Sequence, residues 1–206
     1  SQNQNLPVHT PEKAGSQETL ELVRSLTPEI IMVCAYGQIL PQSFLDIPRV
    51  GCFNLHFSLL PNLRGASPVQ AAIASGLETT GVSLQKIVLK LDAGPLVAAS
   101  KPETILQDDT TPLLGSRLAE IGGQLIHKTL PKLLAENFSA TEQNEGEETY
   151  CRIIKKDEGR VRWTEETARE IERKLRAFTP WPGIFTFYSI SGNNENKRMI
   201  QLPKVE

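Results

Sequence analysis

Three polar side chains, Asn54, His56 and Asp92, stand where two extended segments of the chain are expected to end. Residues two apart in a strand point to the same side, so Asn54 and His56 would project together from the segment 52–57. Asp92 belongs to the sequence LDAG, in which Gly94 permits a tight turn that brings the carboxylate beside the imidazole. Ligands bind at the strand ends of open parallel sheets. We therefore expect these side chains to converge on one site.

Such a trio suits the transfer of an acyl or formyl group to an amine. The reaction passes through a tetrahedral centre with a negative oxygen, and protons must leave the amine and reach the departing nitrogen. Asn54 can donate its amide to the oxyanion, and His56 can stabilise that oxygen as an imidazolium or relay a proton. Asp92 can orient the imidazole and favour its charged form. An isolated Asn-x-His also fits a turn residue beside a hydrogen-bonded structural histidine, and this alternative stays open.

The elements that position this site alternate between helical and extended patterns. Helical spacing of apolar residues predicts helices over 16–26, 43–45, 69–75 and 110–134. Continuous apolar or β-branched runs predict strands over 30–36, 52–57, 81–89 and 96–99. The last strand is expected to pair back antiparallel. Alternation of this kind is typical of an α/β domain, with a mostly parallel sheet flanked by helices.

A polar, acidic stretch at 136–149, ENFSATEQNEGEET, divides the chain. It has almost no core-forming side chains, which is typical of an exposed linker. Beyond it, a helix is expected over 164–178 with Thr164 as its N-cap, and the segments FTFYSI, GNN and MIQL predict a β-hairpin. The domains predicted from this division are 1–135, a linker at 136–154, and 155–206.

The overall composition argues against several classes of protein. With 22 basic and 24 acidic side chains and a formal charge of -2, a nucleic-acid partner would have to bind a local basic surface. No run approaches the roughly 18 apolar residues that cross a bilayer, and the start SQNQN lacks the layout of a signal peptide. We therefore expect a cytoplasmic protein without membrane contact. Cys34, Cys52 and Cys151 are widely spaced among apolar neighbours, which indicates buried thiols and no metal site.

Two longer blocks contain the trio and resemble those of a known family. NLHFSLLPNLRGASPVQ at 54–70 and TGVSLQKIVLKLDAG at 80–94 are similar to the signature blocks of the 10-formyltetrahydrofolate-dependent formyltransferases. AYGQILP at 35–41 resembles the loop that lines the pteridine pocket of that family. KLRAFTPWPG at 174–183 resembles a linker-side motif in the C-terminal domain of its tRNA-directed members. The resemblance spans almost the whole chain.

This resemblance implies a Rossmann-like catalytic domain without its N-terminal strands, then a linker and the truncated start of a small, OB-like β-barrel. It implies that Asn54, His56 and Asp92 are catalytic. The cosubstrate would be 10-formyltetrahydrofolate, and the acceptor would be the α-amine of methionyl-initiator tRNA, in translation initiation. The protein would be a monomer without a metal, in the cytoplasm or, in a eukaryote, the mitochondrial matrix. The residues implied to contact the folate are Ser58, Leu59, Leu60, Pro61, Tyr36, Gly37, Gln38, Ile39, Leu40, Val88, Leu89, Lys90 and Leu91.

Several alternatives share the same sequence blocks. Sugar-nucleotide N-formyltransferases, formyltetrahydrofolate hydrolase domains and a catalytically silent folate- or RNA-binding relative all remain open, whereas glycinamide ribonucleotide transformylases lack the PWPG region. Phe57 stands where the family usually has Gly or Ala, so the space beside His56 would be narrower. The basic residues of the second part predict either an RNA-binding surface or a solvated helix face paired with glutamates. They are Lys155, Lys156, Arg160, Arg162, Arg169, Arg173, Lys174 and Arg176.

Overall fold

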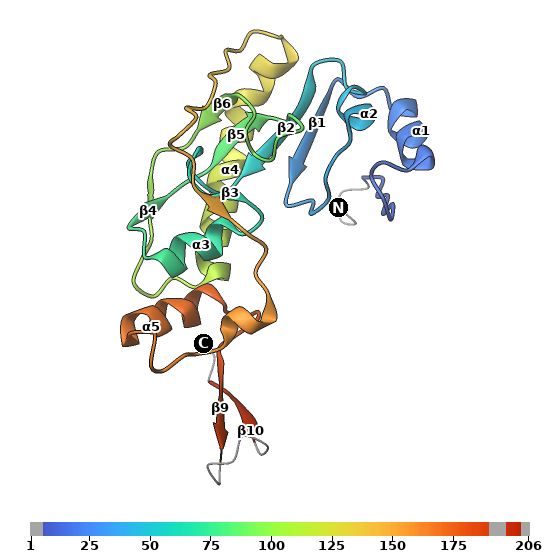
Figure 1. The fold of residues 1–206 in the computed structure, drawn as a ribbon. Helices are drawn as coiled ribbons and strands as arrows, with labels where there is room; N and C mark the ends of the chain where they lie inside the picture. Colours follow the sequence, from blue (N-terminus) through green and yellow to red (C-terminus); the bar gives the residue numbers. More distant parts are fainter. Residues whose placement is uncertain (1–5, 190–196, 203–206) are drawn as a thin grey trace.

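The protein, described here by a computed structural model of residues 6–189 and 197–202, is built around a four-stranded sheet (Figure 1). The strand order is β1-β2-β5-β6. These strands are β1 (Ile30–Cys34), β2 (Gly51–His56), β5 (Ser83–Lys86) and β6 (Leu96–Ala99). Two pairs of two-residue strands lie outside it, namely β3 (Arg64–Gly65) with β8 (Tyr150–Cys151) and β4 (Thr79–Thr80) with β7 (Glu103–Thr104).

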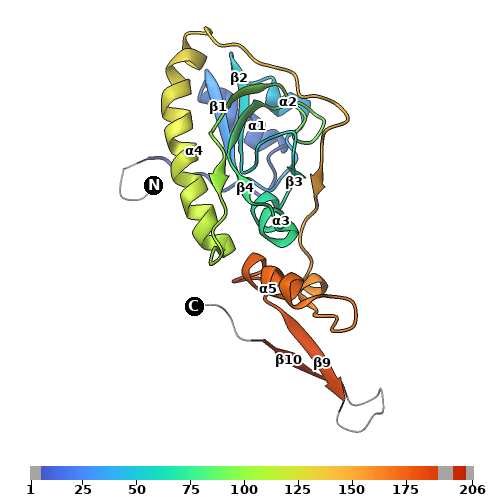
Figure 2. The same ribbon diagram turned by 90° about the vertical axis from the view of Figure 1, so that its left-hand side faces the viewer.

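The helices are α1 (Gln17–Ser25), α2 (Gln42–Leu45), α3 (Pro68–Ser75), α4 (Thr111–Leu134), α5 (Ala168–Ala177) and a 3₁₀-helix, η2 (Lys156–Gly159). Of these, α1, α2 and α4 flank the sheet, and α5 packs against α3. In β2, Phe53 and Leu55 join the main core with α4, while Cys52 joins a smaller core with α1 and α2. Figure 2 shows α4 on one side of the sheet and α1 and α2 on the other. Since side chains alternate along a strand, Asn54 and His56 project on the face opposite α4.

The predicted α/β class, with a Rossmann-like sheet flanked by helices, is confirmed. The sheet is mixed, however, and not mostly parallel as expected. Only β1 and β2 pair in parallel, whereas β5 is antiparallel to both β2 and β6. The chain leaves β2 at His56 and re-enters the sheet at Ser83, which pairs with His56. Because it returns at the edge it left, β5 must run back along β2. The predicted antiparallel return at 96–99 is confirmed.

Local signals set most of the helix ends. Ser16 caps α1 by accepting a hydrogen bond from the backbone of Thr19 at 3.2 Å. The predicted cap at Thr164 is wrong: α5 begins after Thr167, whose hydroxyl accepts from the backbone N–H of Glu170 while the Glu170 carboxylate accepts from the Thr167 N–H at 2.7 Å. No helix among the described residues is both long enough and apolar enough to cross a membrane.

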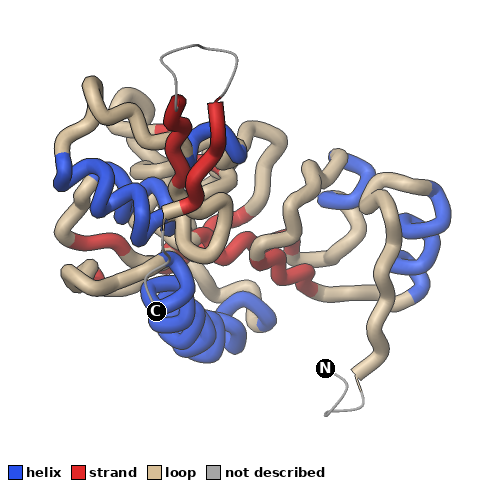
Figure 3. The backbone as a smooth tube through the Cα atoms, turned by 90° about the horizontal axis from the view of Figure 1, so that it is seen from below, coloured by secondary structure: helices blue, strands red, loops and turns tan. Residues whose placement is uncertain are grey.

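The predicted hairpin follows α5. Strands β9 (Phe185–Ser189) and β10 (Lys197–Gln201) pair antiparallel, which confirms the pairing of FTFYSI with MIQL. They extend from the C-terminal part beyond α5, and Figure 3 shows them side by side. The turn expected at GNN lies outside the described residues.

Most residues of the segment 136–154 are exposed, as its polar composition predicted, but the segment also contacts the first domain at several points. Phe138 packs edge to face on Phe53, with ring centroids 5.8 Å apart. Thr141 exchanges two backbone hydrogen bonds with Leu96 of β6, at 2.8 and 2.9 Å. Further along, β8 pairs in parallel with β3. Composition predicted an exposed linker because most of these side chains are polar, and their few long-range contacts leave no local pattern.

The three cysteines are free thiols in different surroundings. Cys52 and Cys151 are buried as predicted, but Cys34 is exposed. Cys34 is the last residue of β1, which forms the edge of the described sheet, so a strand covers it on one side only. Burial, with a smaller contribution from the negative charge of Asp46, raises the pKa of the Cys52 thiol to about 11.

The main core depends strongly on the inner face of α4. Leu118 has an exposed fraction of 0%, whereas Leu113 on the same helix is 54% exposed. We expect Leu118→Ala to lower the free energy of unfolding by about 2–5 kcal/mol, because it removes buried methyl groups and leaves a cavity. Leu113→Ala should change it by no more than about 0.5 kcal/mol. Urea denaturation of both variants measures the difference, and equal losses would contradict the assigned packing of α4.

Candidate active site

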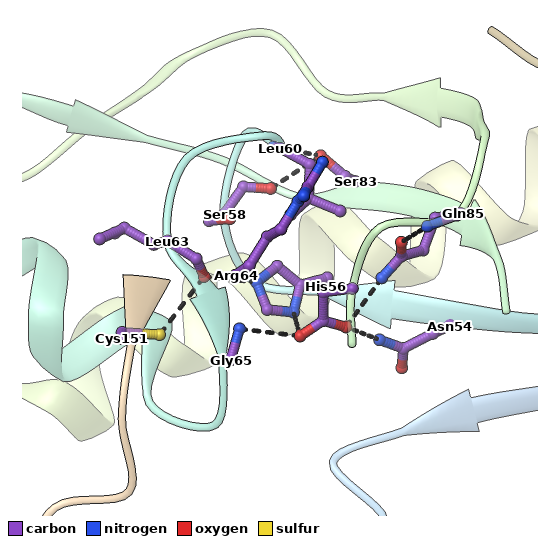
Figure 4. Close-up of polar contacts among 12 residues, drawn as sticks. Asn54, His56, Ser58, Leu60, Leu63, Arg64, Gly65, Ser83, Gln85 and Cys151 are labelled. Atoms are coloured by element: carbon purple, nitrogen blue, oxygen red, sulfur yellow. Dashed lines mark hydrogen bonds and ion pairs between the residues drawn. The ribbon is translucent and has the colours of Figure 1, made fainter. Parts of the chain in front are cut away.

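Asn54 and His56 lie on one face of the sheet (Figure 4), and both are close to the Asp92 carboxylate. The first two belong to β2, and Asp92 lies in the turn between β5 and β6. The Asn54 amide donates to Asp92 Oδ1 at 3.3 Å, and His56 Nδ1 lies 3.6 Å from Asp92 Oδ2. The His56 and Asp92 side chains are only 6% and 10% exposed. The structure thus brings the three residues together as expected, while their catalytic roles stay a prediction.

The Asp92 carboxylate is surrounded by hydrogen-bond donors. Besides Asn54, the Gln85 side-chain amide donates to Oδ1 at 2.8 Å, and the backbone N–H of Gly65 donates to Oδ2 at 2.8 Å. Gly65 has φ +118, and a Cβ there would lie 2.0 Å from the carbonyl oxygen of Cys151. Only glycine therefore lets the chain pass between β8 and this carboxylate. With donors on both oxygens, the position of the carboxylate is well defined.

The imidazole of His56 is held from its other side by a backbone carbonyl. Its Nε2 lies 2.8 Å from the carbonyl oxygen of Leu63, which also accepts from the Cys151 thiol at 3.3 Å. A carbonyl only accepts hydrogen bonds, so Nε2 must carry a proton. The remaining ring nitrogen, Nδ1, faces Asp92. Nδ1 is therefore the ring nitrogen at which His56 could exchange a proton, and it lies beside the Asp92 carboxylate.

The turn after β2, expected to contact the folate, is only partly available to a ligand. Ser58 and Leu60 are buried, with exposed fractions of 1% and 7%. Ser83 of β5 braces them: its hydroxyl donates to the Ser58 carbonyl at 2.8 Å and accepts from the Leu60 N–H at 3.0 Å. The Ser58 and Leu60 side chains therefore offer a ligand little surface, and contact of this loop with the folate stays a prediction. Leu59 and Pro61 are half-buried and remain accessible.

Two further loops carry the remaining predicted folate residues. The loop 36–40 follows β1, whose last residue pairs with Leu55, so it starts beside the His56 end of β2. Its Ile39 is 87% exposed, and Leu89 in the other loop is 64% exposed. Leu40, which the resemblance also implies to contact the folate, is buried in the smaller core with α1 and α2. Exposed apolar side chains of this kind are typical of a surface that a ligand covers.

Polar side chains in the same two loops are already engaged. The Gln38 side chain accepts from the backbone of Ala14 at 3.0 Å and donates to the carbonyl of Glu12 at 3.1 Å. Lys90 forms an ion pair with Glu145 at 2.9 Å. Contact of these two loops with the folate stays a prediction.

A cavity of about 300 Å³ lies between α1 and β1. Its wall includes Tyr36 and Leu40 but none of the trio. The described residues contain no group of three or more His, Cys, Asp or Glu side chains able to hold a metal ion.

Gln85, Gly65, Leu63 and Ser83 contribute to the site, although the sequence analysis did not single them out. The first three contact Asp92 or His56 directly. Gln85 follows Leu84 and precedes Lys86 in a predicted strand, and only the structure shows that it is 2% exposed. A buried polar group needs partners, so such a position marks a network. Leu63 acts through its backbone, for which a sequence has no signal.

Three members of the basic group predicted in the second part are paired with acids. Arg162 lies 3.5 Å from Glu165, Lys174 pairs with Glu166, and Arg176 pairs with Glu172. Arg160 lies over the ring of Phe187, with 5.2 Å between the guanidinium carbon and the ring centroid. For Arg162, Lys174 and Arg176 the structure therefore favours the glutamate-paired helix face over a free RNA-binding surface.

Comparison with known proteins agrees with this fold. Residues 2–130 match the formyl transferase family, and residues 153–205 match the formyl transferase C-terminal domain. The chain belongs to the formyl transferase family, which confirms the family predicted from the two sequence blocks. It is 42% identical over 182 residues to the methionyl-tRNA formyltransferase of Marinobacter nauticus, a match that covers 88% of this chain and 58% of that protein. The predicted domain limits at 135 and 155 stay predictions.

Solved structures share the same fold. A sugar N-formyltransferase from a Shewanella species superposes with a TM-score of 0.74 at 18% identity, covering 94% of this chain and 76% of that one. HypX from Aquifex aeolicus in complex with tetrahydrofolic acid gives a TM-score of 0.69 at 19% identity, covering 81% of this chain and 29% of that one. At these identities the likeness concerns the fold alone.

Proposed function

We propose that the protein transfers a formyl group from 10-formyltetrahydrofolate to the α-amine of methionyl-initiator tRNA, in support of translation initiation. The observation that carries this proposal is the convergence of Asn54, His56 and Asp92, with His56 Nδ1 3.6 Å from the Asp92 carboxylate. The match to a methionyl-tRNA formyltransferase favours a tRNA acceptor, because it covers 88% of this chain. A cytoplasmic location, a monomeric state and the absence of a metal stay predictions.

In the proposed reaction each member of the trio acts on charge or on a proton. One amide hydrogen of Asn54 is directed at Asp92 Oδ1, which leaves the second to donate to the oxygen of the tetrahedral centre. His56, held at Nε2 by Leu63, moves a proton at Nδ1 between the attacking amine and the departing nitrogen. Asp92 holds the imidazole in place and balances its charge. The amine must be neutral to attack, and no covalent bond to the protein forms.

The choice of acceptor is tested by offering alternatives to the same enzyme. We expect the complete protein to form formylmethionyl-tRNA from charged initiator tRNA, with no formylation of a UDP-amino sugar and no release of formate to water. Formylation of the sugar alone would contradict the proposal and indicate a sugar-nucleotide N-formyltransferase. Release of formate alone would contradict it and indicate a formyltetrahydrofolate hydrolase. A silent relative was considered because of Phe57, yet this side chain packs against the main core, so it gives no support to a blocked acceptor space.

Folate binding is tested on the exposed apolar side chains of the two loops. Ile39→Ser and Leu89→Ser should each raise the dissociation constant for tetrahydrofolate by about 10-fold, because burying such a side chain contributes about 1.5–3 kcal/mol. Leu106→Ser serves as control, since Leu106 is 49% exposed and lies in neither loop. Calorimetric titration measures all three variants. Unchanged binding by both loop variants would place the folate elsewhere.

A further inference from the structure

The segment that follows the first domain contacts the residues that support the candidate site. Thr141 is bonded to Leu96, just after the turn that carries Asp92. Eight residues later, Thr149 accepts through its hydroxyl from the Leu63 N–H at 2.8 Å, next to the carbonyl that holds His56. The stretch 141–151 is therefore anchored to the supports of both Asp92 and His56.

Between these two anchors lies Gln143, whose side chain is 8% exposed. Its Nε2 donates to the carbonyl oxygens of Asp92 and Gly94 at 2.9 and 2.7 Å. Both carbonyls belong to the turn in which Asp92 adopts φ +47, a left-handed conformation that L-residues seldom adopt. A non-glycine residue stays in that region only when its surroundings hold it there. The two hydrogen bonds from Gln143 hold the turn in this conformation, although Gln143 is distant from it in sequence.

The orientation of the Gln143 amide is fixed by a buried arginine. Arg64 is 1% exposed, and its Nε and Nη2 donate to Gln143 Oε1 at 2.9 and 2.7 Å. A guanidinium only donates and the two turn carbonyls only accept, so the amide oxygen must face Arg64 and the amide nitrogen must face the turn. Among the hydrogen bonds of the described residues, Arg64 Nη1 has none. The arginine therefore depends on Gln143 for its side-chain partner.

Gln85 links this arrangement to the carboxylate itself. Its Oε1 accepts from the Gly94 N–H at 3.2 Å and lies 3.3 Å from Gln143 Nε2, while its own amide donates to Asp92 Oδ1 at 2.8 Å. Arg64, Gln143 and Gln85 thus form one continuous network that reaches both the backbone and the side chain of Asp92. Apart from Arg64 Nη1, the polar atoms of these three side chains find partners, and such a network can hold a catalytic group in place.

We propose that Gln143 is a positioning residue, which holds the Asp92 turn in its left-handed conformation and makes the segment 141–151 part of the catalytic apparatus. This inference rests on the proposed formyl transfer. Gln143 does not touch the reacting atoms and acts through Asp92. Displacing the carboxylate from His56 would slow the chemical step and leave substrate binding largely intact.

The test is Gln143→Glu in the complete protein. The new carboxylate pairs well with Arg64, but its second oxygen faces the carbonyls of Asp92 and Gly94 and must push the turn away. We expect kcat for methionyl-tRNA formylation to fall about 10- to 100-fold, with both KM values changed by less than about two-fold. Asn144→Asp makes the same amide-to-acid change at the exposed neighbouring position and should keep wild-type kcat.

A double-mutant cycle separates positioning from a general loss of structure. In the Asp92→Asn background, Gln143→Glu should lower kcat by less than about two-fold further, because Gln143 acts through the Asp92 carboxylate, which that background already lacks. Full additivity of the two losses would overturn the proposal, and so would wild-type kcat for Gln143→Glu. If thermal unfolding shows that Gln143→Glu does not fold, Gln143→Met, which also lacks the amide donor, is measured in the same cycle and judged by the same outcomes. Absence of formyl transfer by the wild type would instead overturn the proposed function, and the positioning role with it.

Discussion

Replacing His56 with alanine in the complete enzyme should lower turnover by about 100-fold or more, because a general acid or base contributes about that much. Folate binding should change by less than about two-fold, since His56 is only 5% exposed and offers a ligand little surface. Single-turnover formylation of charged initiator tRNA measures the chemical step, and calorimetric titration measures folate binding. The split between the two results is the expected signature of a group that acts on protons.

His127→Ala provides the matched control for this prediction. His127 is exposed on α4 and has no contact with the trio, so its removal should leave turnover within about two-fold of wild type. Wild-type single-turnover rates for His56→Ala would show that the imidazole carries no proton in the rate-limiting step. In that case the structural interpretation of His56, hydrogen-bonded to the Leu63 carbonyl and close to Asp92, would be the correct one.

Asp92→Asn should also lower turnover by about 100-fold, although it changes the shape of the side chain very little. The carboxylate accepts from Asn54, Gln85 and the Gly65 N–H, and it faces His56 as well. An amide has only one acceptor oxygen, so its NH₂ group must meet at least one buried donor without a partner. The loss of negative charge also removes the support for a charged imidazole.

Asp108→Asn is the corresponding control, because Asp108 is exposed and does not belong to the sequence segments that carry Asn54, His56, Gln85 or Asp92. It should retain turnover within about two-fold of wild type. The same single-turnover assay serves both variants, and circular dichroism shows whether each is folded. A folded Asp92→Asn enzyme with wild-type turnover would remove Asp92 from the mechanism and leave His56 without its proposed partner.

Sequence alone was sufficient wherever the determining contacts are local. The helices α1 and α4 follow from apolar residues three and four apart, and the cap of α1 at Ser16, bonded to Thr19, is equally local although it was not predicted. The shared face of Asn54 and His56 follows from the alternation of side chains in a strand. Each of these features is determined by residues within about five positions of one another, so apolar periodicity and capping preferences indicate it in the sequence.

The tertiary structure decided the features whose partners are distant in sequence. The bond from Gly65 to Asp92 spans 27 residues, and the bond from Arg64 to Gln143 spans 79. The direction of β5 depends on where the chain re-enters the sheet, and the burial of Leu40 depends on the helices packed above it. A polar linker composition could not reveal that Gln143 is buried behind the site. Hydrogen-bond partners of this kind are chosen by the folded geometry, since many side chains of the same type could supply the same donor.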